Sequence, residues 1–168
     1  MPGKKHRENR SIYIYTEKFT EGEWHPFKIL KMIEIPDDEC YFMMESRQGN
    51  RMLMPAKYYA NYGIEPKSTV LCRIDKINCS GRIFLEPAHP YYATGELYDF
   101  KLTKKRQMID RKNRKVERYF MMGHRNKIFE AITEDLNHLL IPCRIQARIT
   151  GIRKGVLILR DIKLINNC

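Results

Sequence analysis

The sequence has no long apolar run and no apolar stretch at its beginning. Nowhere in its 168 residues do about 18 apolar residues follow one another, which is the length that a membrane-spanning helix requires. The charged opening, MPGKKHRENR, is not followed by the apolar segment of a signal peptide. We therefore expect a soluble, cytoplasmic protein with no membrane partner.

The cysteines and histidines lack the spacings of metal sites. The five cysteines contain no Cys-x-x-Cys pair, and no two of the five histidines stand four residues apart. This pattern favours reduced thiols over disulfides or zinc. No histidine has a carboxylate, serine or cysteine at the spacing of a catalytic motif, and no glycine-rich phosphate loop is present. We expect no enzyme, no cofactor and no metal.

What the sequence does have is positive charge, and most of it lies in the second half. Lys and Arg number 31 against 20 Asp and Glu, a formal net charge of +11, which favours polyanionic partners. Residues 1–94 carry a net charge of +2, and residues 95–168 carry +9. The segment 101–118 alone holds nine Lys or Arg. Such a segment is typical either of a solvated loop or of a loop that binds phosphates.

Four short motifs recur in the same order in the two halves, which predicts an internal duplication. GEWHPFK at 22–28 is echoed by GELYDFK at 95–101, and YFMM at 41–44 returns unchanged at 119–122. CRI at 72–74 returns at 143–145, and GRIFL at 81–85 is matched by GVLIL at 155–159. We divide the chain into a basic N-terminal tail, 1–10, a first domain with its linker, 11–92, and a second domain, 93–168, with a basic loop at 101–118.

Short β-branched and aromatic runs, bounded by turn residues, predict strands throughout. In the first domain they lie at about 27–35, 40–46, 51–54, 69–78 and 82–86, with a short helix at 57–62 that Gly63 ends. The second domain repeats this order, with a helix near 131–139 and strands near 142–150 and 155–164. The predicted fold class is all-β with short helices: two tandem five-stranded OB-like Greek-key barrels from an internal duplication.

The run TVLCRIDKI at 69–77, followed by GRIFL at 81–85, resembles the last two strands of ribosomal-S-one-type (S1-like) OB domains. This resemblance implies a five-stranded barrel that binds single-stranded RNA. It also implies a binding face with exposed aromatic rings on the second and third strands and basic residues around them.

Adjacent aromatic residues in a strand point to opposite faces, which concerns Tyr41 with Phe42 and Tyr119 with Phe120. A tyrosine hydroxyl is satisfied more easily in water than inside a barrel, so we expect Tyr41 and Tyr119 to point outward, where they could stack on bases. The alternative is that both rings of each pair pack. Phe84 could likewise stack on bases, or it could pack at an interface with the other domain.

Cys72 and Cys143 stand at matching places in two predicted strands in which apolar and charged residues alternate. We expect both to be small core residues and not nucleophiles. His89 lies in a proline-stiffened stretch between the two copies, where we expect it to help to orient the barrels.

Together these features predict a protein that binds single-stranded RNA or DNA, RNA more readily because of the resemblance. The alternative is a protein-interaction or assembly module with a protein partner, since barrels of this kind also serve as docking surfaces. The oligomeric state stays open. The predicted nucleic-acid contacts are basic and aromatic side chains: Tyr41, Arg73, Phe84, Lys101, Lys104, Lys105, Arg106, Arg111, Lys112, Arg114, Lys115, Arg118, Tyr119 and Arg144.

Overall fold

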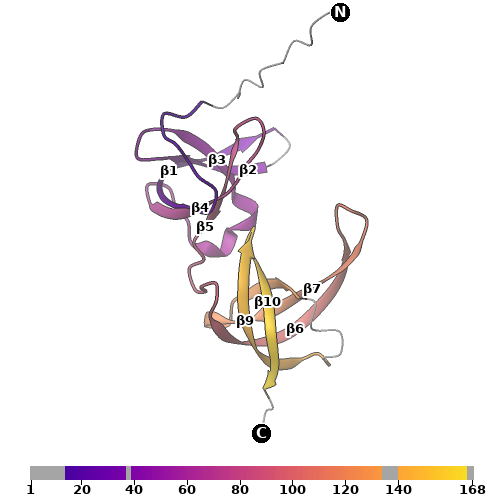
Figure 1. Ribbon diagram of the computed structural model, residues 1–168. Helices are drawn as coiled ribbons and strands as arrows, with labels where there is room; N and C mark the ends of the chain where they lie inside the picture. Colours follow the sequence, from indigo (N-terminus) through magenta and orange to yellow (C-terminus); the bar gives the residue numbers. More distant parts are fainter. Residues whose placement is uncertain (1–13, 37–38, 134–139, 166–168) are drawn as a thin grey trace, which may run out of the picture. The chain divides into compact units, whose positions relative to one another are not determined.

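The computed structural model describes residues 14–36, 39–133 and 140–165, and it is nearly all-β (Figure 1). The chain divides into two compact units, one up to Ala88 and one from His89. The boundary lies slightly before the expected one, because Tyr92 packs in the core of the second unit. The expected basic tail, 1–10, lies outside the described residues.

The first unit is a five-stranded antiparallel sheet. Its strands are β1 (Trp24–Ile35), β2 (Glu39–Glu45), β3 (Arg51–Pro55), β4 (Thr69–Ile77) and β5 (Ile83–Pro87). They lie in the order β3-β2-β1-β4-β5. Alternate side chains point into one core, where Phe27, Ile29, Met44, Cys72 and Ile74 are fully buried. All five predicted strands of this unit are confirmed to within a few residues.

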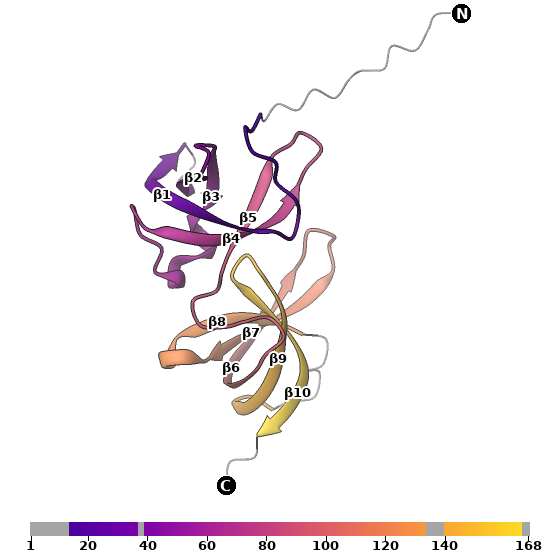
Figure 2. The ribbon, with the colours of Figure 1, turned by 60° about the vertical axis from the view of Figure 1, so that its left-hand side comes forward.

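The second unit is a closed barrel. Its strands are β6 (Leu97–Ile109), β7 (Lys115–Met122), β8 (Ile128–Ile132), β9 (Cys143–Arg153) and β10 (Val156–Ile165). They follow the same order as in the first unit, and β10 closes the barrel by pairing in parallel with β8. Figure 2 shows this barrel from a second side. Its core includes Leu102, Met121, Ile145 and Leu157, which are fully buried.

A proline explains why the second unit closes with hydrogen bonds and the first does not. In the second unit Ile132, the last residue of β8, pairs with Ile158 of β10. Pro55 holds the corresponding last place in β3, and proline has no backbone N–H to donate. Among the described residues, Tyr59 provides a link from the segment after β3 to β5, since its hydroxyl donates to Glu86 at 3.2 Å.

The expected helices are short 3-10 turns at most. Residues 57–62 fall in two turns, η1 (Ala56–Tyr58) and η2 (Ala60–Tyr62), and Gly63 ends the second with a left-handed φ of 66°. The helix expected near 131–139 is wrong at its start, because Ala131 and Ile132 lie in β8. The remainder of that expectation, 134–139, lies outside the described residues. A third turn, η3 (His124–Asn126), precedes β8.

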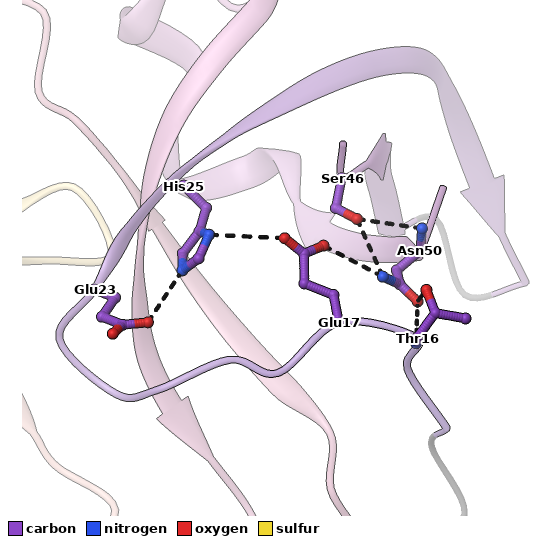
Figure 3. A network of polar contacts seen from close by, with 6 residues as sticks. All are labelled: Thr16, Glu17, Glu23, His25, Ser46 and Asn50. Atoms are coloured by element: carbon purple, nitrogen blue, oxygen red, sulfur yellow. Dashed lines mark hydrogen bonds and ion pairs between the residues drawn. The ribbon is translucent and has the colours of Figure 1, made fainter. Parts of the chain in front are cut away.

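The segment before β1 is tied to the first unit by polar contacts around Asn50 (Figure 3). The Asn50 side chain is buried, and it accepts hydrogen bonds from the backbone N–H of Thr16 at 2.9 Å and from its hydroxyl at 3.1 Å. Its amide donates to Glu17 at 3.3 Å and to Ser46 at 3.2 Å. Glu17 in turn lies 3.9 Å from His25 of β1. Thr16 and Glu17 are therefore tied to the folded unit.

Equivalent hydrogen bonds show which residues of the two units correspond. Gly22 and Gly95 both have positive φ, and each donates its N–H to the carbonyl of an isoleucine, Ile74 in the first unit and Ile149 in the second. Ile74 thus corresponds to Ile149. The three-residue identity CRI is therefore four residues out of structural register, and Cys72 corresponds to Ala147 instead of Cys143.

The two cysteines accordingly differ. Cys72 is fully buried, as predicted, and burial raises the pKa of its thiol to about 12. Cys143 begins β9, where it is half-buried and packs against the core of the second unit, so it is not the equivalent of Cys72.

A second identity, YFMM, is one residue out of register. Ile29 pairs with Met44 and Leu102 pairs with Met121, and in both units a β-bulge follows directly. Met44 therefore corresponds to Met121, and Phe42 corresponds to Tyr119.

Burial follows this register. Phe42 is 4% exposed and Tyr119 is 2% exposed, whereas Tyr41 and Phe120 are half-buried on the outward side. The prediction was right for the first pair of rings and wrong for the second. Tyr119 can stay inside because its hydroxyl donates to Glu117 at 2.5 Å.

We expect Phe42→Ala and Tyr119→Ala each to lower the free energy of unfolding by about 3–5 kcal/mol, because each empties a buried aromatic site. Tyr41→Ala and Phe120→Ala should lower it much less. Urea denaturation of the four variants measures the difference. A Tyr119→Ala variant as stable as the unaltered protein would contradict the assigned faces.

Tyr59→Phe should destabilise the first unit by about 1–3 kcal/mol, because it removes a donor from the buried carboxylate of Glu86. Tyr41→Phe is the matched control, since Tyr41 donates to Glu39 where water can replace the lost hydroxyl. Thermal melts compare the two, and an equal loss would mean that the contact between Tyr59 and Glu86 does not stabilise the seam between β3 and β5.

Candidate nucleic-acid interface

The basic segment 101–118 is a β-hairpin and not a loop. β9 pairs with β6 only at residues 97–102, and β8 pairs with β7 only at residues 119–122. Residues 104–118 therefore pair only with one another and form a two-stranded ribbon, visible in Figure 1 as the hairpin that projects beyond the barrel between β6 and β7. We call residues 104–118 the basic ribbon. The expectation of a loop was wrong. Cross-strand pairing orders the segment, and so do the carboxylates of Asp110 and Glu117.

Asp110 fixes the turn at the tip of the basic ribbon. One carboxylate oxygen accepts the backbone N–H groups of Lys112 at 2.8 Å and Arg114 at 2.9 Å, and the other accepts the Arg114 guanidinium at 2.7 Å. These donors, the backbone of Arg114 foremost, hold the pKa of Asp110 below its usual value. Asn113 takes the left-handed conformation, with φ 59°, that completes the turn. The tip thus has a defined shape that leaves Arg111 and Lys112 exposed.

Glu117 holds the other end of the basic ribbon. Its carboxylate accepts the hydroxyl of Tyr119 at 2.5 Å and lies 3.4 Å from the ammonium of Lys105. The hydrogen bond from Tyr119, with a smaller effect of Lys105, lowers the pKa of Glu117. Both acidic residues of the segment are therefore used to order it.

Three cations and one carboxylate share the outward face of the second unit with an aromatic ring, because Glu130 of β8 pairs across the strands with Phe120. Lys104 pairs across the strands with Phe120, and Arg106 pairs with Arg118, so these four side chains share a face. The Arg106 guanidinium lies 6.0 Å from the centre of the Phe120 ring. Arg118 forms an ion pair with Glu130 of β8 at 2.9 Å.

The same face continues toward β9. Met122 lies two residues after Phe120, and it pairs with Lys101, which in turn pairs with Arg144. We call this set the Phe120 face: Lys101, Lys104, Arg106, Arg118, Phe120, Met122 and Arg144. It holds five cations and two apolar side chains on three adjacent strands.

A groove of about 670 Å³ lies beside the Phe120 face. Its walls come from the basic ribbon, the end of β8 and the start of β10. Four cations line it, Arg114, Lys115, Arg118 and Arg160, with two carboxylates, Asp110 and Glu117, and the apolar side chains of Val116, Ile132 and Ile158. A groove that combines cations with apolar walls suits a ligand that has anionic and flat apolar parts.

The remaining predicted site residues lie in the first unit. Tyr41 is half-buried on β2 and donates to Glu39 at 2.6 Å. Arg73 of β4 forms an ion pair with Asp75 at 3.0 Å. Phe84 of β5 is 39% exposed, and the Arg82 guanidinium lies 5.2 Å from its ring centre. These three side chains lie on three different strands, β2, β4 and β5.

The first unit does not repeat the chemistry of the Phe120 face. From the bulge onward, Met43 holds the place of Phe120, Tyr41 that of Arg118, and Ile33 that of Arg106. The strand register is shared. At these three places, however, the first unit has apolar or uncharged side chains where the second unit has two cations and an aromatic ring.

Two contributors to this site were missed from sequence. Phe120 was assigned to the core, because the hydroxyl of Tyr119 was expected to be satisfied more easily in water than inside the barrel. Arg160 carries no motif and reaches the groove only because β10 closes against β8. Tyr119, by contrast, was predicted as a contact and is buried.

In the part of the chain that the structure describes, no three His, Cys, Asp or Glu side chains gather as metal ligands would. No described helix has the length and apolar character needed to cross a membrane.

A scan against protein-family models and a search of curated proteins found no significant match to the chain.

Proposed function

We propose that this protein binds single-stranded nucleic acid on the second unit, RNA more readily than DNA. The observation that carries the proposal is the outward ring of Phe120 with Lys104, Arg106 and Arg118 around it, beside a cation-lined groove. A flat ring can stack on a base, and the cations around it can contact the phosphates on either side. The preference for RNA follows from the resemblance to S1-like domains.

The fold supports the same proposal. We interpret the two units as tandem OB-like barrels from a duplication, because they share a strand order, a pair of glycine hydrogen bonds and corresponding bulges. In an OB barrel, oligonucleotides bind on the second and third strands, between the first and the last hairpin connections. In the second barrel, Phe120 lies on the second strand, the basic ribbon connects the first strand to the second, and the groove reaches the end of the third strand.

Such a site would tolerate many sequences. Phosphate contacts carry no sequence information, and every base has a face that can stack. Phe120 and its cations form a surface of this kind. We therefore expect affinity to depend on strandedness and salt more than on base composition.

A second candidate is a protein-docking role for the first unit. Trp24 is 50% exposed and Leu71 is 48% exposed, and cross-strand pairing puts them on one face with Pro26 and Arg73. Tryptophan and arginine are typical of the side chains that dominate protein interfaces. Binding through this face should depend little on salt, whereas binding of nucleic acid should weaken steeply.

Phe120→Leu keeps an apolar side chain but removes the ring, and it should weaken binding to a 20-nucleotide single strand by about 5- to 100-fold, the loss of one stacked base. Met43→Leu, at the corresponding place in the first unit, is the matched control and should bind normally. Fluorescence anisotropy measures both. Equal affinity of the Phe120→Leu variant and the unaltered protein would remove the stacking role.

Neutralising Lys104, Arg106 and Arg118 together as glutamines should reduce the slope of log K against log salt by about 2, since each phosphate contact to a single strand contributes about 0.7. The control changes Lys28, Lys31 and Lys67 of the first unit to glutamine, which removes the same charge. Anisotropy titrations at four salt concentrations give the slopes. The same reduction in both variants would mean that only net charge attracts the strand.

A further inference from the structure

The basic ribbon ends in exposed apolar side chains. Ile109 is 67% exposed and Met108 is 41% exposed, and both lie directly before the turn at Asp110. Val116 pairs with Met108 across the ribbon. Lys115 pairs with Ile109, so Ile109 lies beside a cation on one face of the ribbon, while Met108 and Val116 lie on the other face, the one that carries Phe120.

The tip is held in shape before any ligand arrives. The Asp110 carboxylate accepts three hydrogen bonds, one from the backbone N–H of Lys112 and two from Arg114. The backbone N–H of Asp110 donates to the carbonyl of Arg114 at 2.9 Å, and that of Asn113 donates to the carbonyl of Asp110 at 3.0 Å. A preorganised tip loses little conformational entropy on binding. Ile109 is thus presented on a stiff support, flanked by cations.

We propose that the basic ribbon is a wedge that recognises the junction between a duplex and a single strand, with the tip against the last base pair and the single strand on the Phe120 face. This inference rests on the proposed function, since it uses the same face for the single strand. Apolar side chains such as isoleucine and methionine act in this way in other proteins, where they insert between base steps and unstack them. The last pair of a duplex has one uncovered face, so less stacking has to be broken there.

The charges of the ribbon suit such a ligand. Arg111 and Lys112 extend from the turn, and Lys105 and Lys115 lie along the two strands. A wedge at a junction has phosphates on both sides, because the duplex strands separate around it. Cations on both strands of the ribbon can contact both backbones, which a cation patch on one strand cannot do.

The length of the ribbon sets the length of single strand required. Phe120 pairs with Lys104, five residues before Ile109, so ring and tip are separated by roughly 17 Å at the rise of a β-strand. A stacked strand advances about 3.4 Å per nucleotide, so a tail of about five nucleotides reaches from the junction to Phe120. Shorter tails should not reach the ring.

A membrane surface is the other partner that an apolar tip between cations could enter. Side chains that anchor proteins at a bilayer surface are commonly tryptophan or phenylalanine on a broad apolar face. The described tip has neither, and its apolar part is small. The aromatic ring and the groove at the base of the ribbon also favour nucleic acid.

The test compares RNA ligands with the full-length protein: a 20-nucleotide single strand, a blunt duplex, and the duplex with a tail of two or of eight nucleotides. The last base pair of the duplex contains 2-aminopurine, whose fluorescence rises when it unstacks. We expect the eight-nucleotide tail to bind about tenfold tighter than either the blunt duplex or the two-nucleotide tail, with a rise in fluorescence.

Ile109→Ser should abolish the fluorescence rise and the preference for the tailed duplex, and it should leave affinity for the single strand unchanged. Leu164→Ser, which alters a 53% exposed leucine on β10, is the matched control and should behave like the unaltered protein.

Three results would overturn the inference. If the unaltered protein binds the single strand without a rise in fluorescence or a preference for the tailed duplex, the wedge is wrong and the proposed function stands. If Ile109→Ser leaves RNA binding unaltered but abolishes binding to phosphatidylserine vesicles, the tip belongs to a membrane surface. If no RNA or DNA binds at all, the proposed function fails, and the wedge fails with it.

Discussion

A β-bulge between Leu102 and Lys104 decides which side chains of β6 join the outward face of the second unit. The extra residue, Thr103, lies outside the regular pairing, and its hydroxyl donates to the carbonyl of Phe120 at 3.0 Å. A shift of one residue reverses every side chain that follows in a strand. With the bulge in place, Lys104 and Arg106 lie on the outward face beside Phe120, a ring that simple alternation along β7 already points away from the core. The Phe120 face therefore depends on the position of this one residue.

Sequence patterns predicted the strands well and the faces of the second unit poorly, for one physical reason. Strands follow from β-branched and aromatic runs, which are local. Faces follow from hydrogen-bond register, which depends on bulges and on pairing with distant strands. The identity YFMM appears in both units, but Phe42 of the first corresponds to Tyr119 of the second. The nine cations of 101–118 could be found from composition. That the segment forms an ordered ribbon could not, because this depends on the contacts of Asp110 and Glu117.

The two units keep a common frame and differ in the residues that the frame exposes. Pro55 ends β3, and Ile132 ends β8 at the corresponding place. Backbone hydrogen bonds therefore join β8 to β10 in the second unit, whereas β3 and β5 of the first unit remain the two edges of an open sheet. Met43 stands where the second unit has Phe120. The unit in which an outward phenylalanine lies among cations is also the one with a closed barrel beneath them. Closure matters for the site, because Ile158 and Arg160 reach the groove only through the pairing of β10 with β8.

The acidic residues of the basic ribbon explain how so many cations can be ordered together. Like charges on adjacent strands repel one another, and a two-stranded ribbon alone is only marginally stable in water. Asp110 offsets this at the turn, where it binds Arg114 and the backbone, and Glu117 offsets it at the base, where it binds Lys105 and Tyr119. Lys104, Arg111, Lys112 and Lys115 remain exposed on a backbone that is already in place. The two carboxylates lower the net charge of the segment, yet they are what allows the remaining charge to be presented in a fixed arrangement.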